Sequence, residues 1–298
     1  MKKHITLFAA LALLASCKSE LAPVKPDAIK PTVVTQPTPH DTDDPSIWIN
    51  PADATKSLII GTDKDTDGGL YVYDLNGKII NKSETLKRPN NVDIAYGLTI
   101  SGKTYDVAIT TERERDMIRI FSIPDMKPLD NGGIPVFDGE TEKGPMGVAI
   151  YTRPSDKAIF AIVGRKSGPS GSYLWQYKIS DSGNGYATAQ AVRKFGSFSG
   201  KKEIEAIAVD NELGYLYYCD ETVGIKKYIA DPDAKNDKEL ALFGTEGFVS
   251  DHEGIAIYKK TATTGYILVS NQQSNTFMVF AREGDKGNIN SHTLLAEI

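Results

Sequence analysis

The sequence predicts an all-β protein built from repeated sheets, and three observations lead to that prediction. From residue 43 onward a pattern of short strands recurs about every 45 to 50 residues. Each repeat contains runs of β-branched and aromatic residues separated by turn residues such as Asn76-Gly77. After residue 20 no run shows the period of an amphipathic helix. Five such repeats favour a β-propeller, in which neighbouring sheets bury each other's faces, over a β-sandwich, which needs no fixed period.

Each repeat begins with a polar or acidic group followed by a strand of alternating character. We expect these first strands at 44–49, 91–96, 146–151, 205–209 and 253–258. The second strand is strongly apolar, at 58–61, 105–110, 158–163, 215–219 and 266–270. The third is rich in aromatic residues, at 70–75, 118–123, 173–179, 225–229 and 277–281. The spacing leaves room for a fourth strand in each repeat but does not show whether one is present.

The N-terminus is predicted to be an export signal. Lys2 and Lys3 precede an apolar run at 5–14, which is too short to cross a bilayer and has the length of a signal-peptide core. The run ends in Leu14-Ala15-Ser16-Cys17, which resembles a bacterial lipobox and implies cleavage before Cys17 and lipidation of its sulfur. A plain secretory signal with an incidental cysteine is the alternative. We expect a lipid-anchored protein of the cell envelope, in the outer membrane and facing either side of it.

The remaining chain divides into a tether and one domain. Residues 17–40 carry five prolines without an apolar period, and they predict an extended, semi-rigid link. Residues 41–298 hold the repeats. Cys219 lies in an apolar, tyrosine-rich strand, so we expect a buried core residue without chemistry.

Composition excludes several classes of protein. The chain has 298 residues and a formal charge of −5, which argues against a nucleic-acid binder that works through a basic face. Two cysteines cannot form a disulfide framework, and four scattered histidines leave little material for a zinc site or a His-based triad. The sequence contains no G-x-S-x-G, Walker A or H-E-x-x-H motif. The chemistry that remains is that of carboxylates, lysines and arginines.

Carboxylates recur at the start of the first strands. Because first strands line the central channel of a propeller, groups at this phase converge at one end of the axis. Several like charges at short range repel unless cations are present, and oxygen ligands without histidine or thiolate suit Ca²⁺. The alternative for each residue is a turn cap that binds local backbone N–H groups. The set contains Asp43, Asp44, Asp93, Glu205, Asp251 and Glu253.

Positive groups recur between the second and third strands. They are Lys64, Arg113 or Arg115, and Arg165-Lys166. Cations beside a metal-bridged carboxylate cluster form a site for a multiply charged anion, such as a phosphate. Taken singly, each is expected to be a solvated surface charge. Asp63–Gly68 also matches the opening of an EF-hand loop, but it lies between two strands and favours a hairpin turn with at most a peripheral Ca²⁺.

Four ordered segments carry a resemblance to the β-propeller phytases, of the calcium-dependent, 3-phytase-like type. They are His40-Asp41-Thr42-Asp43-Asp44-Pro45-Ser46-Ile47-Trp48, Pro89-Asn90-Asn91-Val92-Asp93-Ile94, Glu203-Ile204-Glu205-Ala206-Ile207-Ala208 and Asp251-His252-Glu253-Gly254-Ile255. The similarity runs from about residue 40 to residue 298. It implies a six-bladed propeller that removes phosphate from myo-inositol hexakisphosphate (phytate) with several Ca²⁺ ions, by attack of a metal-activated water.

The resemblance also implies residue roles. The metal ligands are expected to be Asp43, Asp44, Asp93, Glu205, Glu221, Asp251 and Glu253. The expected catalytic residues are Lys64, Arg113, Lys166 and Glu205. Substrate binding is assigned to Lys64, Arg113, Arg165, Lys166 and Asn91. Arg115 stays open as the alternative to Arg113, because the loop that carries both is shorter than the family's usual one.

Several departures from the family pattern accompany these assignments. Asp65 stands where the family often has a second lysine, Met146 where it often has a tyrosine, and Ser167 where it often has a glutamate. A second phosphate site is therefore expected to differ. The family continues beyond the equivalent of Ile298 into a sixth blade, so we expect that this chain holds five blades and is a truncated reading of a longer protein.

Two other functions stay open. One is a different calcium-dependent propeller hydrolase, such as a lactonase, which needs few catalytic cations; the recurring lysines and arginines count against it. The other is a surface-tethered binding propeller without catalysis. For the phytase-like reading we expect a small-molecule substrate, a membrane contact through the lipid anchor, no nucleic-acid partner and a monomer.

Overall fold

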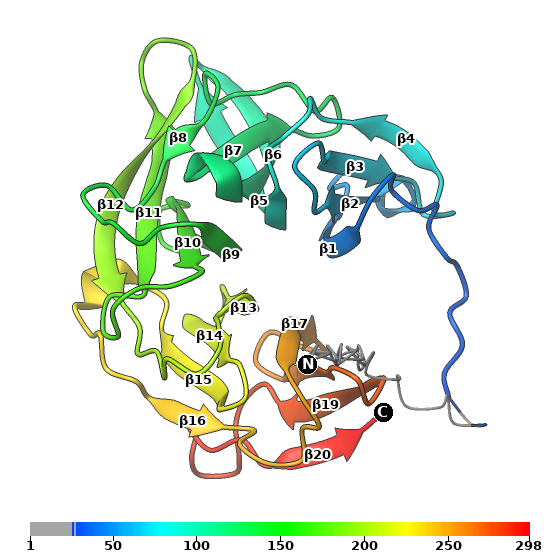
Figure 1. Cartoon of the computed structure of the whole chain (residues 1–298), viewed down its shortest axis with the longest axis vertical. Helices are drawn as coiled ribbons and strands as arrows, with labels where there is room; N and C mark the ends of the chain where they lie inside the picture. Colours follow the sequence, from blue (N-terminus) through cyan, green and yellow to red (C-terminus); the bar gives the residue numbers. More distant parts are fainter. Residues whose placement is uncertain (1–25, 27) are drawn as a thin grey trace, which may run out of the picture.

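The protein folds into five four-stranded antiparallel sheets that surround a central axis (Figure 1). The computed structural model describes residue 26 and residues 28–298. In every sheet the strands follow chain order from the axis outward, so each sheet is a meander of consecutive hairpins. Within the described residues the helical elements are three 3₁₀ turns, at Ala54–Lys56, Arg113–Arg115 and Pro232–Ala234. The predicted all-β propeller with five blades is confirmed.

The strands of the first three sheets are short and consecutive. The first sheet contains β1 (Thr42–Trp48), β2 (Leu58–Asp63), β3 (Gly69–Tyr73) and β4 (Ile79–Lys82). The second contains β5 (Pro89–Ile100), β6 (Lys103–Glu112), β7 (Met117–Ser122) and β8 (Ile134–Pro135). The third contains β9 (Pro145–Thr152), β10 (Ile159–Arg165), β11 (Leu174–Asp181) and β12 (Ala187–Phe195).

The last two sheets repeat this plan. The fourth contains β13 (Ile207–Asp210), β14 (Tyr215–Asp220), β15 (Gly224–Ile229) and β16 (Ala241–Phe243). The fifth contains β17 (His252–Lys259), β18 (Gly265–Asn271), β19 (Thr276–Ala281) and β20 (Leu294–Glu297). All fifteen predicted strands are present, and each sheet adds an outer fourth strand that the sequence left open, of two to four residues in every sheet but the third, where β12 has nine.

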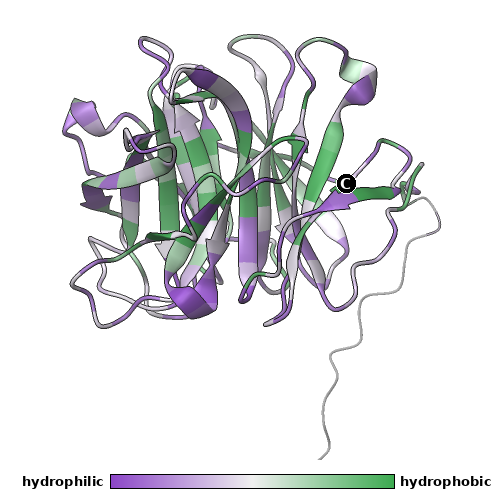
Figure 2. Cartoon of the chain, turned by 90° about the horizontal axis from the view of Figure 1, so that it is seen from above, coloured by the Kyte–Doolittle hydropathy of each residue, from purple (hydrophilic) through white to green (hydrophobic). Residues whose placement is uncertain are grey.

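Hydrophobic cores fill the spaces between consecutive sheets. Trp48 and Ile60 pack against Val92 and Phe121 between the first and second sheets. Equivalent cores join the second sheet to the third, the third to the fourth and the fourth to the fifth. The apolar strands therefore lie inside and the hydrophilic loops gather at the two ends of the axis (Figure 2). Cys219 is fully buried in the last of these cores, as predicted.

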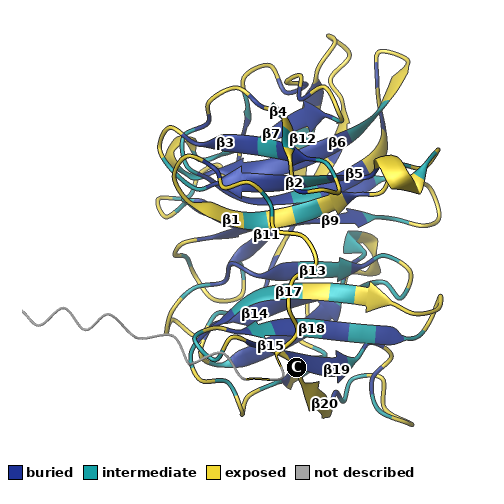
Figure 3. Ribbon diagram, turned by 90° about the vertical axis from the view of Figure 1, so that its right-hand side faces the viewer, coloured by how far each residue is buried: buried dark blue, intermediate teal, exposed yellow. Residues whose placement is uncertain are grey.

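The first and fifth sheets differ from the others because, within the described part of the chain, no shared core joins them. Parts of β1, β17 and β20 are exposed on this side of the molecule, whereas the strands behind them are buried (Figure 3). A hollow of about 920 Å³ lies here, lined by Ile29, Pro45, Ile255, Phe277 and Ile298 among others.

The segment that precedes β1 is held against the first sheet. The Gln36 backbone N–H donates to the Gly77 carbonyl at 2.8 Å, and the Gln36 side chain accepts from the Ile79 N–H at 2.8 Å. Gly77 has φ +79°, and a Cβ there would lie 2.7 Å from the Val34 carbonyl oxygen, so glycine suits both the turn and the close approach. The predicted signal and Cys17 fall outside the described residues. No helix within the described residues is both long and apolar enough to cross a membrane.

Candidate functional site

Charged side chains converge at one end of the central channel. They come from the starts of the innermost strands and the ends of the second strands, which lie at the same end because these two strands are antiparallel in every sheet. A hollow of about 580 Å³ is lined there by Asp43, Asp44, Asn91, Glu205 and Glu253, together with residues of the loop after β18. Four of the five sheets thus contribute to one acidic pocket.

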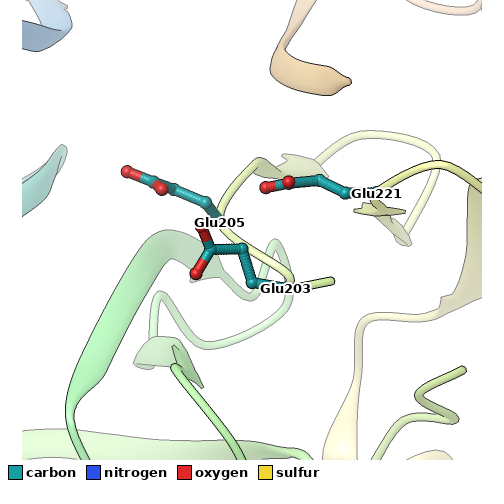
Figure 4. A group of neighbouring side chains, drawn as sticks. All are labelled: Glu203, Glu205 and Glu221. Atoms are coloured by element: carbon teal, nitrogen blue, oxygen red, sulfur yellow. The ribbon is translucent and has the colours of Figure 1, made fainter. Parts of the chain in front are cut away.

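Three glutamates form the centre of this acidic group. Glu203, Glu205 and Glu221 each offer a carboxylate oxygen, and these atoms lie within 4.8 Å of one another. Figure 4 shows the Glu221 side chain extending toward the other two. Glu205 and Glu221 are buried, so their mutual repulsion is only weakly screened by solvent.

Backbone pairing in the fourth sheet explains why these glutamates meet. The Glu221 N–H donates to the Glu203 carbonyl at 3.1 Å, and the Cys219 N–H donates to the Ala206 carbonyl at 3.0 Å. The end of β14 is therefore aligned with the segment that leads into β13. Both glutamates of the Glu203-Ile204-Glu205 sequence end beside Glu221 as a result.

Asp44 connects the first sheet to the second. Its Oδ2 accepts from the Val92 N–H at 2.9 Å, and its own N–H donates to Thr62 Oγ1 at 3.0 Å. Burial raises the pKa of Asp44 to about 8, and the charges of Asp43, Asp93 and Glu205 act in the same direction. The carboxylate is therefore costly to ionise without a nearby cation.

Asp93 has a different environment from the other predicted metal ligands. Its Oδ2 accepts from the Ile150 N–H at 2.7 Å, and its Oδ1 accepts from the Ile94 N–H at 2.7 Å and from Ser46 Oγ at 3.2 Å. These bonds join three sheets. They also occupy both carboxylate oxygens, which is the turn-capping arrangement considered as the alternative for each acidic residue.

Three lysines are paired with the pocket carboxylates. Lys64 Nζ lies 2.8 Å from Asp43 Oδ2 and 3.4 Å from Glu205 Oε1. Lys166 forms an ion pair with Glu203. Lys202 forms ion pairs with Glu221 and Asp251, at 3.1 Å from Glu221 Oε2. Of the predicted lysines, Lys64 thus lies beside the predicted carboxylates Asp43 and Glu205, and Lys166 lies beside Glu203, which was not predicted.

The structure distinguishes the two candidate arginines of the second sheet. Arg113 Nη2 contacts Asn90 Oδ1 and Met146 Sδ, and Asn90 Nδ2 in turn donates to Glu205 Oε1. Burial lowers the pKa of Arg113. Arg115 instead lies 3.6 Å from Glu112 and is half exposed. Arg113 is therefore the arginine that faces the pocket.

The contacts of Arg165, a predicted substrate-binding residue, are with the loops at 140–142 and 172 rather than with the carboxylates of the pocket. Its guanidinium is fully buried and donates to the Glu142 carbonyl at 3.0 Å and the Ser172 carbonyl at 2.9 Å. It also stacks on Phe137, with 4.8 Å from its Cζ to the ring centroid. Arg165 is the last residue of β10, whereas Lys166 lies in the bend that follows, so these neighbours have different surroundings.

The acidic group has the properties of a site for a hard divalent cation. Both Glu221 carboxylate oxygens and Glu253 Oε2 are buried without a hydrogen-bond donor. Burial raises the pKa of Glu221 to about 7, and burial followed by the charge of Glu205 raises the pKa of Glu253. Such oxygens are stabilised by ion coordination, and a set made only of carboxylate and amide oxygens suits Ca²⁺. The residues present therefore fit a metal ion of this class.

Three residues of the site were missed by the sequence reasoning: Asn90, Lys202 and Glu203. Glu203 could have been found, because residues two apart in an extended segment share a face and Glu205 was already a candidate. Asn90 and Lys202 carried no separate signal, since a single asparagine or lysine near a strand end is usually an ordinary surface residue.

Comparisons with known proteins agree with this geometry. The model of the phytase family matches residues 5–296. A 3-phytase of Bacillus subtilis (strain 168) is 31% identical over 249 residues, which cover 81% of this chain and 62% of that protein. The chain therefore aligns with less than two thirds of the length of that relative. On the extent of the family match, together with this identity, the chain belongs to the phytase family.

Proposed function

We propose that this protein hydrolyses phosphomonoesters of phytate and that it requires Ca²⁺. The observation that carries the proposal is the convergence of four pocket carboxylates and three cations, Lys64, Arg113 and Lys166, at one channel mouth. Family membership and the similarity to a 3-phytase support the same reaction class. The orphaned oxygens of Glu221 and Glu253 support the metal requirement.

Two groups of carboxylates would hold the metal ions. Asp43, Asp44, Glu205 and Glu253 line the pocket, and Glu221 and Asp251 lie beside it on the fourth and fifth sheets. When bound, Ca²⁺ would neutralise phosphate oxygens and lower the pKa of a coordinated water. Asp93, whose oxygens are already occupied by backbone donors, is assigned to holding the three sheets in register.

The two lysines and the arginine would bind the phosphate group of the substrate. Lys64 and Lys166 each carry an ammonium at the rim of the carboxylate group, and Arg113 reaches it through Asn90. These positive charges would bind the anion and stabilise the charge that spreads over the phosphoryl oxygens as the alcohol leaves. Glu205, between Lys64 and Asn90, positions both groups.

The test is release of inorganic phosphate from calcium phytate, with and without EDTA. We expect release that is lost in EDTA and restored by added Ca²⁺. p-Nitrophenyl phosphate and a lactone serve as alternative substrates. Full activity in EDTA would contradict the metal requirement, and lactone hydrolysis without phosphate release would replace the proposal with a lactonase-like reaction.

A further inference from the structure

The Lys202 ammonium lies between two buried carboxylates. Its Nζ is 3.1 Å from Glu221 Oε2 and also contacts Asp251 Oδ2. Glu221 is 1% exposed and Asp251 is 6% exposed, whereas the Lys202 side chain is 44% exposed. The lysine therefore reaches from the solvent side into a carboxylate pair that is otherwise closed from water.

Lys202 is the ion-pair partner that the structure gives Glu221, within the described residues. Neither Glu221 oxygen has a hydrogen-bond donor that meets the usual geometry, so the contact is one of charge rather than of directed bonding. Lys202 itself lies in a bend between β12 and β13, outside any strand. Its side chain can leave the carboxylates without breaking a β-sheet hydrogen bond.

An ammonium and a divalent cation compete for these carboxylates. The Lys202 ammonium lies against one oxygen of each, and a +1 and a +2 charge a few ångströms apart repel. We propose that Lys202 is a tethered counter-cation that occupies the Glu221–Asp251 pair in the metal-free protein and must leave it when a divalent cation binds. Lys202 thereby sets the calcium concentration at which this part of the site fills. This inference rests on the proposed role of Glu221 and Asp251 as metal ligands.

The first test is the affinity for Ca²⁺ by isothermal titration calorimetry of the metal-free protein, without substrate. Lys202→Met removes the ammonium and keeps the aliphatic stem, and it is expected to tighten binding by about five- to tenfold. Lys202→Arg keeps the charge and is expected to bind Ca²⁺ as the unmodified protein does. Lys201→Met, at the exposed neighbouring lysine, is the matched control and should change nothing.

The second test is thermal unfolding. In EDTA, Lys202→Met leaves Glu221 and Asp251 without their cation, so its melting temperature should fall below that of the unmodified protein. Its gain in melting temperature on adding Ca²⁺ should be larger than that of the unmodified protein. A calcium affinity that is unchanged or weaker in Lys202→Met would overturn the inference, as would an unchanged melting temperature in EDTA.

These measurements separate the inference from the proposed activity. Tighter calcium binding by Lys202→Met supports the inference even if phytate is not hydrolysed. Absence of Ca²⁺ binding by both proteins removes the metal assignment and the inference with it, whatever substrate the protein acts on.

Discussion

Two clusters of buried charges in this molecule differ in how completely their charged atoms are paired. In the second sheet, Arg119 of β7 is 1% exposed and binds Asp130 at 2.8 Å, Glu112 at 3.3 Å and Glu84 at 2.6 Å. Glu112 and Asp130 also accept the backbone N–H groups of Lys87 and Ile120. At the channel mouth, by contrast, buried oxygens of Glu221 and Glu253 have no donor.

The difference shows what each cluster is for. Buried charges persist in a fold only when they are paired, hydrogen-bonded or bound to an ion. The Arg119 cluster meets that condition with its own side chains and backbone, so its effect is confined to the fold. The channel cluster meets it only in part, since Lys202 pairs with Glu221 by charge alone and Glu253 Oε2 has no hydrogen-bond donor, so its oxygens remain available for a cation from outside.

The largest effect is expected from breaking the matched cluster. Arg119→Met leaves Glu112 and Asp130 buried without their cation and should lower the free energy of unfolding by about 3–5 kcal/mol. Urea denaturation followed by circular dichroism measures this. Lys56→Met, at an exposed pair with Asp53, should leave stability nearly unchanged. If both variants lost the same free energy of unfolding, burial of the ion pair would not explain its contribution to stability.

A second effect concerns the channel cluster and should appear in rate rather than in stability. Lys64→Ala removes one charge that would face the transferred phosphoryl group, and we expect kcat on calcium phytate to fall by about 10²–10³-fold. Lys87→Ala, which breaks an ion pair with Asp67 at 2.9 Å outside the pocket, is the control. Comparable losses of kcat in the two variants would contradict a special role for Lys64.

The smallest effect isolates the cost of one unmatched buried charge. Lys227 of β15 is fully buried and has no ion pair within the described residues. Its ammonium donates to the Ile289 carbonyl, lies 3.3 Å from His292 Nε2, and lies 3.9 Å from the Tyr215 ring centroid. Burial lowers the pKa of Lys227 to about 8, although the charge of Asp210 opposes the shift.

The direction of the pH dependence follows from that pKa. Between pH 8 and 10.5 the unfolded chain holds more protons at Lys227 than the folded protein does, so the free energy of unfolding should rise with pH in this window. Lys227→Met should remove this rise and stabilise the protein at pH 7 by about 2–3 kcal/mol. Denaturation midpoints at pH 7, 8.5 and 10 measure both. An unchanged slope in the variant would assign the rise to other groups.

Much of the fold could be predicted because its signals are local. Alternation places Ile60 of β2 and Val72 of β3 on the buried faces of their strands, and the repeat period gives the number of sheets. The outer strands could not be predicted, since β8 has two residues and β20 is exposed along its length. Such strands are defined by their pairing with a neighbour rather than by their own apolar pattern.

The sequence predicted which residues form the site as a group, but not the contacts of each side chain. The shared phase of Asp44, Glu205 and Glu253 in their repeats indicated that they meet, and they line one pocket. The direction of each side chain could not be predicted from this shared phase. Arg165 and Lys166 are adjacent in sequence, yet Arg165 ends β10 and is buried, whereas Lys166 lies in the following bend and pairs with Glu203. The same phase placed Asp93 among the expected ligands, and its oxygens accept backbone N–H groups from two sheets.

The ion pair between Lys64 and Glu205 also bears on the order in which the protein assembles. It joins residues 141 positions apart, whereas each strand pairing in a sheet connects consecutive strands of the chain. Contacts between near neighbours form with a small loss of chain entropy, and contacts across long loops form later. Each hairpin can therefore arise alone, but the carboxylate pocket exists only after the sheets have docked in sequence. The site is a late product of folding, and its presence reports that tertiary assembly is finished.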